Sequence, residues 1–249
     1  MLLHDKIALV TGAGSGFGRA LVERLIREGV KVAAFDIDSS KLDELKLLSP
    51  EIETFVCDVS DNFQVERSVS GCFEKFGELN ILVNNAGIME NAPIVNLLDR
   101  NDRKHSLELW HQVINVNQNS VFYMTRAVAD QMTQRRNKGI IVNISSIAAK
   151  GNLGQTAYSA SKAAVEAMTK VWSKELGRFG IRSVAIAPGF INTLGAADAI
   201  EDRMLQHWVD KTPLRRTGEV NEVVESIIFA ISNDFLNGEV ISINGGLTL

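Results

Sequence analysis

Two polar residues with helical spacing could exchange a proton with a substrate. Tyr158 and Lys162 lie four residues apart in Tyr-Ser-Ala-Ser-Lys, which places both side chains on one face of a helix, one turn apart. A tyrosine with an ordinary pKa of about 10 is a weak base at neutral pH. A neighbouring ammonium favours the phenolate, so we expect Lys162 to lower the pKa of Tyr158 toward the range useful for acid/base catalysis. Such a tyrosine can protonate a ketone oxygen during reduction or deprotonate an alcohol during oxidation.

A pair of serines could act on the oxygen of the same substrate. Ser145 and Ser146 follow the apolar run 139–144. A hydroxyl at the end of a strand can donate a hydrogen bond to a substrate oxygen as negative charge develops there. Paired serines are also common turn residues, so the pair by itself leaves the role open.

A glycine-rich turn near the beginning of the chain could bind the phosphates of a dinucleotide. The segment 11–18, Thr-Gly-Ala-Gly-Ser-Gly-Phe-Gly, follows the first apolar run 7–10. Gly12 permits a tight turn, Gly16 lets the backbone approach a pyrophosphate, and Gly18 allows close packing of the following helix. The amides at the beginning of that helix would receive the phosphates.

An acidic residue about 20 positions beyond this turn suits the ribose of adenosine. Asp36 ends the second apolar run 31–35. Its carboxylate can accept hydrogen bonds from the ribose hydroxyls, and it repels a 2′-phosphate. Neither Ser15 nor Ile37 is a basic residue that would bind such a phosphate. The sequence therefore predicts NAD rather than NADP as the cofactor.

Two more polar segments follow apolar runs. Asp58-Val59 comes after the run 54–57, where the acid could meet the adenine amino group, and 84–87, Asn-Asn-Ala-Gly, comes after 81–83. Each segment could be ordinary loop chemistry, because Asn, Asp and Gly are frequent in turns. Their repeated occurrence after successive apolar runs favours one shared site.

Seven apolar runs alternate with amphipathic segments of helical period, and this alternation must position these groups. The runs are 7–10, 31–35, 54–57, 81–83, 139–144, 183–186 and 239–243, and the helical segments include 20–26, 65–73, 121–132 and 163–176. Runs that are apolar on both faces are typical of a parallel sheet covered on both sides. We predict the α/β class: a single Rossmann-type doubly wound parallel sheet of about seven strands, flanked by helices on both faces. Ligands of such sheets bind beyond the carboxyl ends of the strands.

Composition excludes several other classes of function. The chain has 249 residues, 45% of them hydrophobic, and shows no linker or repeat, so we expect one domain over 1–249. A net charge of −4 argues against a nucleic-acid surface. No uncharged apolar stretch reaches the length of about 18 residues that a membrane span needs. Two cysteines and four histidines without ligand spacing predict no metal site. We expect a cytoplasmic, soluble protein.

Together these motifs resemble the short-chain dehydrogenase/reductase family. The resemblance extends from Ile7 to the C-terminus. It is carried by Thr11-Gly-x-x-x-Gly16-x-Gly18, Asn84-Asn85-Ala86-Gly87, Ser146, Tyr158-x-x-x-Lys162 and Pro188-Gly189.

The resemblance implies a role for each catalytic residue. Tyr158 would be the general acid/base, Ser146 would polarise the carbonyl, and Lys162 would lower the tyrosine pKa and bind the nicotinamide ribose. The family usually places the serine thirteen residues before the tyrosine, a spacing that fits Ser145, whereas Ser146 stands twelve before it. The pattern Asn-x-Ser-Ser favours Ser146 with a one-residue deletion, and Ser145 stays open as the alternative.

The resemblance also implies a proton relay and a full set of cofactor contacts. Asn117 matches the asparagine that holds a helix kink and a water molecule, with Asn115 and Asn119 as competitors. Pro188-Gly189 and Thr193 match the segment that contacts the carboxamide. The predicted cofactor residues are Gly12, Ser15, Gly16, Phe17, Gly18, Asp36, Ile37, Asp58, Val59, Asn85, Ala86, Gly87, Tyr158, Lys162, Pro188, Gly189, Ile191 and Thr193.

The substrate is expected to be an apolar or acyl alcohol or ketone. The predicted lid, 191–214, contains mostly apolar residues: Leu194, Ala196, Ala197, Met204, Leu205 and Trp208. Such a lid suits an acyl chain, a steroid or an aromatic ketone. The polar stretch 98–105 and the tail 233–240 are similar to type II 3-hydroxyacyl-CoA dehydrogenases, also known as 17β-hydroxysteroid dehydrogenases. Much of the remainder is shared with 3-oxoacyl carrier-protein reductases.

Three further interpretations concern a basic segment, a different class of protein and the oligomeric state. Arg100, Arg103 and Lys104 could meet a coenzyme A phosphate or could lie on a solvated loop. A non-catalytic NAD-sensing regulator is the alternative from another class, although it would have no use for Ser146, Tyr158 and Lys162. Family members are usually homotetramers, which would put the helices over 108–133 and 157–179 at one interface and the C-terminal strand at another.

Overall fold

Seven parallel strands form the central sheet, in a computed structural model that describes residues 1–98, 102–192 and 202–249. In sheet order they are β3 (Ile52–Val56), β2 (Lys31–Asp36), β1 (Ile7–Thr11), β4 (Ile81–Asn84), β5 (Gly139–Ile144), β6 (Ile181–Pro188) and β9 (Val240–Ile243). The strand order reverses between β1 and β4, which is where ligands of doubly wound sheets bind. The predicted fold class is confirmed.

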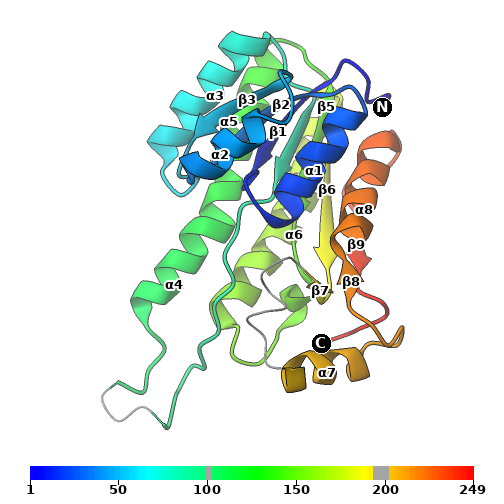
Figure 1. Ribbon diagram of the computed structural model, residues 1–249. Helices are drawn as coiled ribbons and strands as arrows, with labels where there is room; N and C mark the ends of the chain where they lie inside the picture. The colour runs from blue at the N-terminus through cyan, green and yellow to red at the C-terminus, as the bar shows by residue number, and fades with distance from the viewer. Residues whose placement is uncertain (99–101, 193–201) are drawn as a thin grey trace.

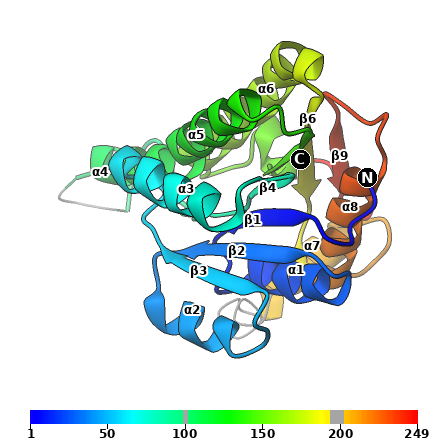
Figure 2. The same cartoon turned by 90° about the horizontal axis from the view of Figure 1, so that it is seen from above.

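Helices cover both faces of the sheet, as Figure 2 shows. One face carries α1 (Gly16–Arg27), α2 (Ser39–Lys46) and α8 (Val220–Ser232); the other carries α3 (Asn62–Phe76), α5 (Ser120–Gln134) and α6 (Thr156–Leu176). Each face has its own apolar core, with Leu21 and Ile227 in one and Val69 and Met132 in the other. The four helical segments expected from periodicity lie within α1, α3, α5 and α6.

The two edge strands depart from the expectation of full burial. In β3 only Ile52 is buried, and Val56 is 54% exposed. The strand also begins two residues before the expected run 54–57 and ends at Val56. An edge strand has a neighbour on one side only, so apolar residues there stay partly in contact with water. In β9 no residue is fully buried.

Most of the remaining elements lie around the carboxyl edge of the sheet, whereas the 3₁₀ turn η3 (Gly177–Phe179) joins the end of α6 to the beginning of β6 at the opposite edge. The others are α4 (Leu107–Ile114), the π-helix η1 (Asn115–Asn119), the 3₁₀ turn η2 (Ile147–Lys150), α7 (Asp202–Lys211), and the short strands β7 (Ile191–Asn192) and β8 (Gly218–Glu219). The β7–β8 pair was not expected from the sequence. The stretch between β4 and α4 extends away from the sheet before α4 returns the chain to it (Figure 1).

Candidate active site

The glycine-rich turn joins β1 to α1 at the carboxyl edge. Gly12 has a φ of +63° and Gly16 a φ of +52°, which favour glycine because other residues clash there. A Cβ atom on Gly18 would lie 2.0 Å from the carbonyl oxygen of Gly12, so no side chain fits. A Cβ atom on Gly16 would have no atom within 4 Å. The backbone at Gly16 therefore borders open space into which a ligand can come.

Thr11 and Asn85 fasten this turn to the end of β4. The hydroxyl oxygen of Thr11 accepts hydrogen bonds from the backbone amides of Asn85 and Ala86, both at 3.0 Å. The side-chain amide of Asn85 donates to the carbonyl oxygens of Thr11 at 2.9 Å and Gly12 at 3.2 Å. This role of Thr11 was not expected from the sequence, although its place as the last strand residue before the first glycine was a usable signal.

The carboxylate of Asp36 lies against the glycine-rich turn. One oxygen accepts from the backbone amide of Gly14 at 2.8 Å, and the other accepts from the amide of Asp38 at 3.0 Å. Asp38, and not Asp36, caps α2, because its carboxylate accepts from the amides of Ser40 and Lys41. Asp36 therefore lies beside the glycine-rich turn and is not the cap of α2.

The other predicted adenosine contacts, Asp58, Val59 and Ile37, differ in their burial and hydrogen bonding. Asp58 lies two residues beyond the end of β3, and one of its oxygens accepts from the amide and hydroxyl of Ser60 at 2.9 and 2.7 Å. Val59 is buried and Ile37 is 66% exposed. The structure therefore brings Asp58 into a local turn with Ser60.

The hydroxyl groups of Ser146 and Tyr158 lie near each other, and their interaction lowers the Tyr158 pKa. Ser146 precedes η2, where its hydroxyl oxygen also accepts from the amide of Ala148 at 3.1 Å. The hydroxyl of Ser145 is turned elsewhere: it donates to a carboxylate oxygen of Glu166 at 3.0 Å and lies 3.3 Å from the carbonyl oxygen of Lys162. The geometry thus brings Ser146 to the tyrosine.

Lys162 lies behind the tyrosine in a buried position. Its ammonium donates to the carbonyl oxygen of Ile144 at 2.8 Å and lies 5.7 Å from the centre of the Tyr158 ring. Burial lowers the pKa of Lys162 to about 8, since an apolar environment disfavours the charged form.

The expected lowering of the Tyr158 pKa is wrong for this arrangement. Burial raises the pKa of Tyr158 above its ordinary value, and the interaction with Ser146 offsets this only in part. Burial destabilises the phenolate of Tyr158 by more than its neighbours stabilise it. The ammonium of Lys162 contributes little, because it is directed at Ile144. The phenol is consequently protonated at neutral pH.

Asn117 lies at the centre of the π-helix between α4 and α5. Its side-chain amide pairs with the backbone of Ile88, accepting from the amide and donating to the carbonyl oxygen, both at 2.8 Å. Asn115 and Asn119 instead bond to each other at 2.8 Å on the exposed side. A Cβ atom on Gly87 would lie 3.1 Å from the Asn117 oxygen and 3.5 Å from the Lys162 nitrogen, so these three residues converge.

The C-terminal side of the edge contributes a further set of predicted residues. Pro188 ends β6, Gly189 donates its amide to the carbonyl oxygen of Ile243 at 2.8 Å, and Ile191 begins β7. Thr193 lies outside the described residues, as do Leu194, Ala196, Ala197 and Arg100. The side chains of Met204 and Leu205 are likewise not described. Arg103 and Lys104 are exposed on the extension between β4 and α4.

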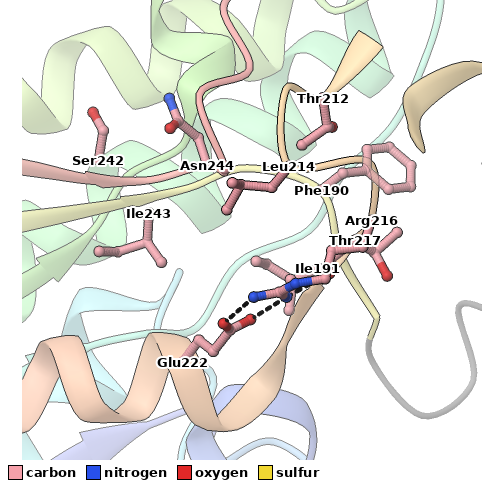
Figure 3. A pocket seen from close by; sticks show the side chains of 12 residues that line it. Phe190, Ile191, Thr212, Leu214, Arg216, Thr217, Glu222, Ser242, Ile243 and Asn244 are labelled. Carbon is pink, nitrogen blue, oxygen red and sulfur yellow. Dashed lines mark hydrogen bonds and ion pairs between the residues drawn. The ribbon is translucent and has the colours of Figure 1, made fainter. Parts of the chain in front are cut away.

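A cavity of about 220 Å³ opens next to this segment (Figure 3). Ile191 and Leu214 give it apolar walls, and the ion pair between Arg216 and Glu222 closes one side. Nearby, Phe190 stacks on Trp208 of α7 with ring centres 5.3 Å apart. Ser146 and Tyr158 are not among the described residues that line this cavity.

The residues around the glycine-rich turn fit a nicotinamide dinucleotide. The side chain of Ser15 makes no capping hydrogen bond at the beginning of α1, which leaves the first amides of this helix able to receive phosphate oxygens. Gly16 borders open space, and Asp36 adjoins the turn. Among the residues that the structure describes, no group of three or more His, Cys, Asp or Glu could hold a metal ion.

Comparison with known proteins decides the family. The family model described as short chain dehydrogenase matches residues 6–203. The chain belongs to the short-chain dehydrogenase family. This short-chain dehydrogenase is 39% identical to the 3-oxoacyl-[acyl-carrier-protein] reductase of Thermotoga maritima, with 100% of each chain covered. It is 36% identical to the 3-hydroxyacyl-CoA dehydrogenase type-2 of Drosophila melanogaster, with 100% of this chain and 99% of the relative covered.

Family membership confirms the predicted class of activity. The dog (3R)-3-hydroxyacyl-CoA dehydrogenase is also 34% identical, over 98% of this chain and 97% of the relative. The short-chain dehydrogenase is accordingly an oxidoreductase that acts on hydroxyl or keto groups with a nicotinamide cofactor. No helix in the described ranges is long and apolar enough to cross a membrane.

Proposed function

We propose that this short-chain dehydrogenase uses Tyr158 as its general acid/base and Ser146 to polarise the substrate carbonyl. The proximity of these two hydroxyl groups carries the proposal. It brings an acidic hydroxyl and a second donor to one point at the carboxyl edge of the sheet, where both can reach the same substrate oxygen. The contact of the Ser145 hydroxyl with Glu166 supports the assignment of this role to Ser146 rather than Ser145.

In ketone reduction, Tyr158 gives its phenolic proton to the carbonyl oxygen while Ser146 donates a hydrogen bond to that oxygen. When bound, the nicotinamide cofactor supplies a hydride to the substrate carbon, or accepts one in the reverse direction. In alcohol oxidation, Tyr158 accepts the hydroxyl proton. The raised pKa of Tyr158 keeps its proton in place at neutral pH, which favours reduction there and requires higher pH for oxidation.

Lys162 and Asn117 are buried residues that support this site from within the protein. The buried ammonium of Lys162, bonded to Ile144, is the cation that we propose contacts the nicotinamide ribose. Asn117 clamps the backbone of Ile88, and in this way it keeps the neighbouring Gly87 against the site. A water relay from Lys162 past Asn117 is part of the proposal.

We propose NAD as the preferred cofactor, bound along the glycine-rich turn and Asp36. The support is the Asp36 carboxylate, which lies 2.8 Å from the Gly14 amide and would repel a 2′-phosphate. The exposed Ile37 offers such a phosphate no counter-charge. Beyond these, the proposed cofactor contacts are Asp58, Val59, Asn85, Ala86, Gly87, Tyr158, Lys162, Pro188, Gly189, Ile191 and Thr193.

The proposed substrate is a 3-hydroxyacyl or 3-oxoacyl thioester, with a hydroxysteroid as the related possibility. Two relatives covered along nearly their whole length are named for 3-hydroxyacyl-CoA and one for a 3-oxoacyl group on acyl-carrier protein. The aromatic pair Phe190–Trp208 supports an apolar substrate under the proposed lid over 191–214. A carrier-protein-linked reductase and an aryl or alkyl ketone reductase remain the alternatives.

We further propose one domain over 1–249, assembled as a homotetramer in the cytoplasm. The tetramer follows from family resemblance. Both cysteines, Cys57 and Cys72, are buried free thiols, and burial raises the pKa of each, which suits a protein that relies on no disulfide. Light scattering on the purified chain tests the assembly.

The proposal is tested by steady-state kinetics with NAD(H) and NADP(H) on an acetoacetyl thioester, a steroid and an aryl ketone. NADH-linked turnover of the thioester is the expected result. Tyr158→Phe should lower kcat by at least about 100-fold while the Kd for NADH stays within about twofold. Tyr123→Phe, which changes the only other tyrosine, is the matched control. Substantial turnover by Tyr158→Phe would remove the tyrosine from its role.

A further inference from the structure

One buried acidic side chain near the proposed catalytic residues has no part in the mechanism above. Glu166 lies on α6, four residues beyond Lys162, and is only 9% exposed. One of its carboxylate oxygens accepts from the hydroxyl of Ser145 at 3.0 Å, and the other lies 3.5 Å from the ammonium of Lys150. Burying a carboxylate is unfavourable unless partners compensate the loss of its hydration. A buried glutamate at this position of the helix therefore indicates a specific role.

The two partners of Glu166 are the two ends of one short segment. Ser145 directly follows β5 and Lys150 ends η2. Ser146, whose hydroxyl meets Tyr158, lies between them. A single carboxylate on α6 therefore contacts both ends of the segment that carries Ser146.

The helix that carries Glu166 also carries Tyr158, which Ser146 approaches, and Lys162. Tyr158, Lys162 and Glu166 succeed one another at four-residue intervals, on one face of α6. Because a helix is rigid over two turns, the distance from Glu166 to Tyr158 is nearly constant. Fastening Ser145 to Glu166 thus sets the position of the neighbouring Ser146 relative to the phenol.

We propose that Glu166 is a positioning residue for the reaction, acting through Ser145 and Lys150 to hold the Ser146 hydroxyl at Tyr158. The inference rests on the proposed function of Ser146 and Tyr158. Small displacements of a catalytic group can cost large factors in rate. Satisfying the Ser145 hydroxyl alone does not require Glu166, since the carbonyl oxygen of Lys162 lies 3.3 Å away as another acceptor.

A double-mutant cycle with Ser146 tests this inference. Glu166→Ala is made in the wild type and in Ser146→Ala, and kcat, KM and the Kd for NADH are measured for each. In the wild type we expect Glu166→Ala to lower kcat about tenfold or more, with KM and Kd changed less than about threefold. In the Ser146→Ala background, the same change should lower kcat by less than about twofold, because the residue it positions is already gone.

Two further variants separate positioning from stability. Glu166→Gln keeps an acceptor for Ser145, so we expect it to restore kcat to within about threefold of the wild type. Glu175→Ala removes an exposed glutamate from the same helix and should leave kcat unchanged. Thermal unfolding of each variant shows whether it is folded, and Ser145→Ala, a smaller change, replaces Glu166→Ala if that variant fails to fold.

The outcomes distinguish this inference from the proposed function. An equal loss of kcat in both backgrounds, or no loss in the wild type, would overturn the positioning role of Glu166 and leave Ser146 and Tyr158 as proposed. If Tyr158→Phe or Ser146→Ala kept full turnover, the proposed function itself would fail. A loss that disappears in the Ser146→Ala background supports both.

Discussion

The ammonium of Lys162 donates a hydrogen bond of 2.8 Å to the backbone carbonyl oxygen of Ile144, the last residue of β5. This contact joins α6 to the sheet directly beside the segment that carries Ser146. It also places a charged group in a buried environment, where burial lowers the pKa of Lys162 to about 8. The position of this lysine thus has consequences for stability as well as for the reaction.

Burial of Lys162 should make the stability of the folded chain depend on pH. Between about pH 8 and 10.5 the unfolded chain holds a proton on this lysine that the folded chain has released, so the free energy of unfolding rises with pH in this window. Across this pH window, the free energy of unfolding of the wild type should rise by up to about 3 kcal/mol relative to that of Lys162→Met. Urea unfolding at several pH values measures the difference. The exposed Lys170→Met should show the same pH dependence as the wild type. A difference between the wild type and Lys162→Met that stays constant across this window would contradict the prediction.

Loss of the Ser146 hydroxyl should shift the pH dependence of alcohol oxidation. The interaction with Ser146 lowers the Tyr158 pKa, so Ser146→Ala should move the rise of kcat/KM with pH to higher values and reduce kcat about 100-fold. Ser145→Ala removes a hydroxyl that bonds to Glu166, so it should shift the position of that rise less than Ser146→Ala does. Initial rates across pH decide between the two serines; a shift caused by Ser145→Ala alone would reverse their assignment.

Gly18 should tolerate no side chain. A Cβ atom there would lie 2.0 Å from the Gly12 carbonyl oxygen, so Gly18→Ala must displace the turn from α1. We expect a loss of about 2 kcal/mol in the free energy of unfolding and weaker NADH binding. Gly71→Ala in α3 is the control, since its Cβ would make only an ordinary contact of 3.5 Å with Phe55 and should stabilise the helix by about 0.5–1 kcal/mol. Urea unfolding and NADH fluorescence measure both effects.

Removing the charge of Asp36 should relax the preference for NAD. Asp36→Asn keeps the shape of the side chain and one acceptor for the Gly14 amide, but it no longer repels a 2′-phosphate. We expect the ratio of kcat/KM for NADP to that for NAD to rise at least about tenfold. Asp43→Asn, an exposed change on α2, should leave the ratio unaltered. A wild-type enzyme that already prefers NADP would contradict the role of Asp36.

Most of the fold and the place of the candidate site were predictable from the amino-acid sequence. Runs such as 31–35 and 139–144 are apolar on both faces and can be buried only between two layers of helices. The order of runs and helical segments then brings their carboxyl ends to one edge. For this reason the glycine-rich turn, Asp36 and the Tyr158–Lys162 pair could be assigned to one site before any contact was known.

Other properties depend on the folded arrangement. Ser145 and Ser146 are adjacent and chemically identical, and the packing of α6 against the end of β5 decides which hydroxyl meets Tyr158 and which meets Glu166. Three nearby asparagines likewise differ only in that Asn117 is turned inward by the π-helix. Local spacing cannot distinguish such neighbours.

The pKa of Tyr158 shows most clearly which properties follow from local sequence and which follow from tertiary structure. The sequence determined that a lysine lies one helical turn away, which by itself predicts a lowered pKa. Only the tertiary structure decided that the Lys162 ammonium turns to Ile144 and that the phenol is partly removed from water, so its pKa is raised. Desolvation depends on everything that packs around a group, and residues distant along the chain supply most of that packing.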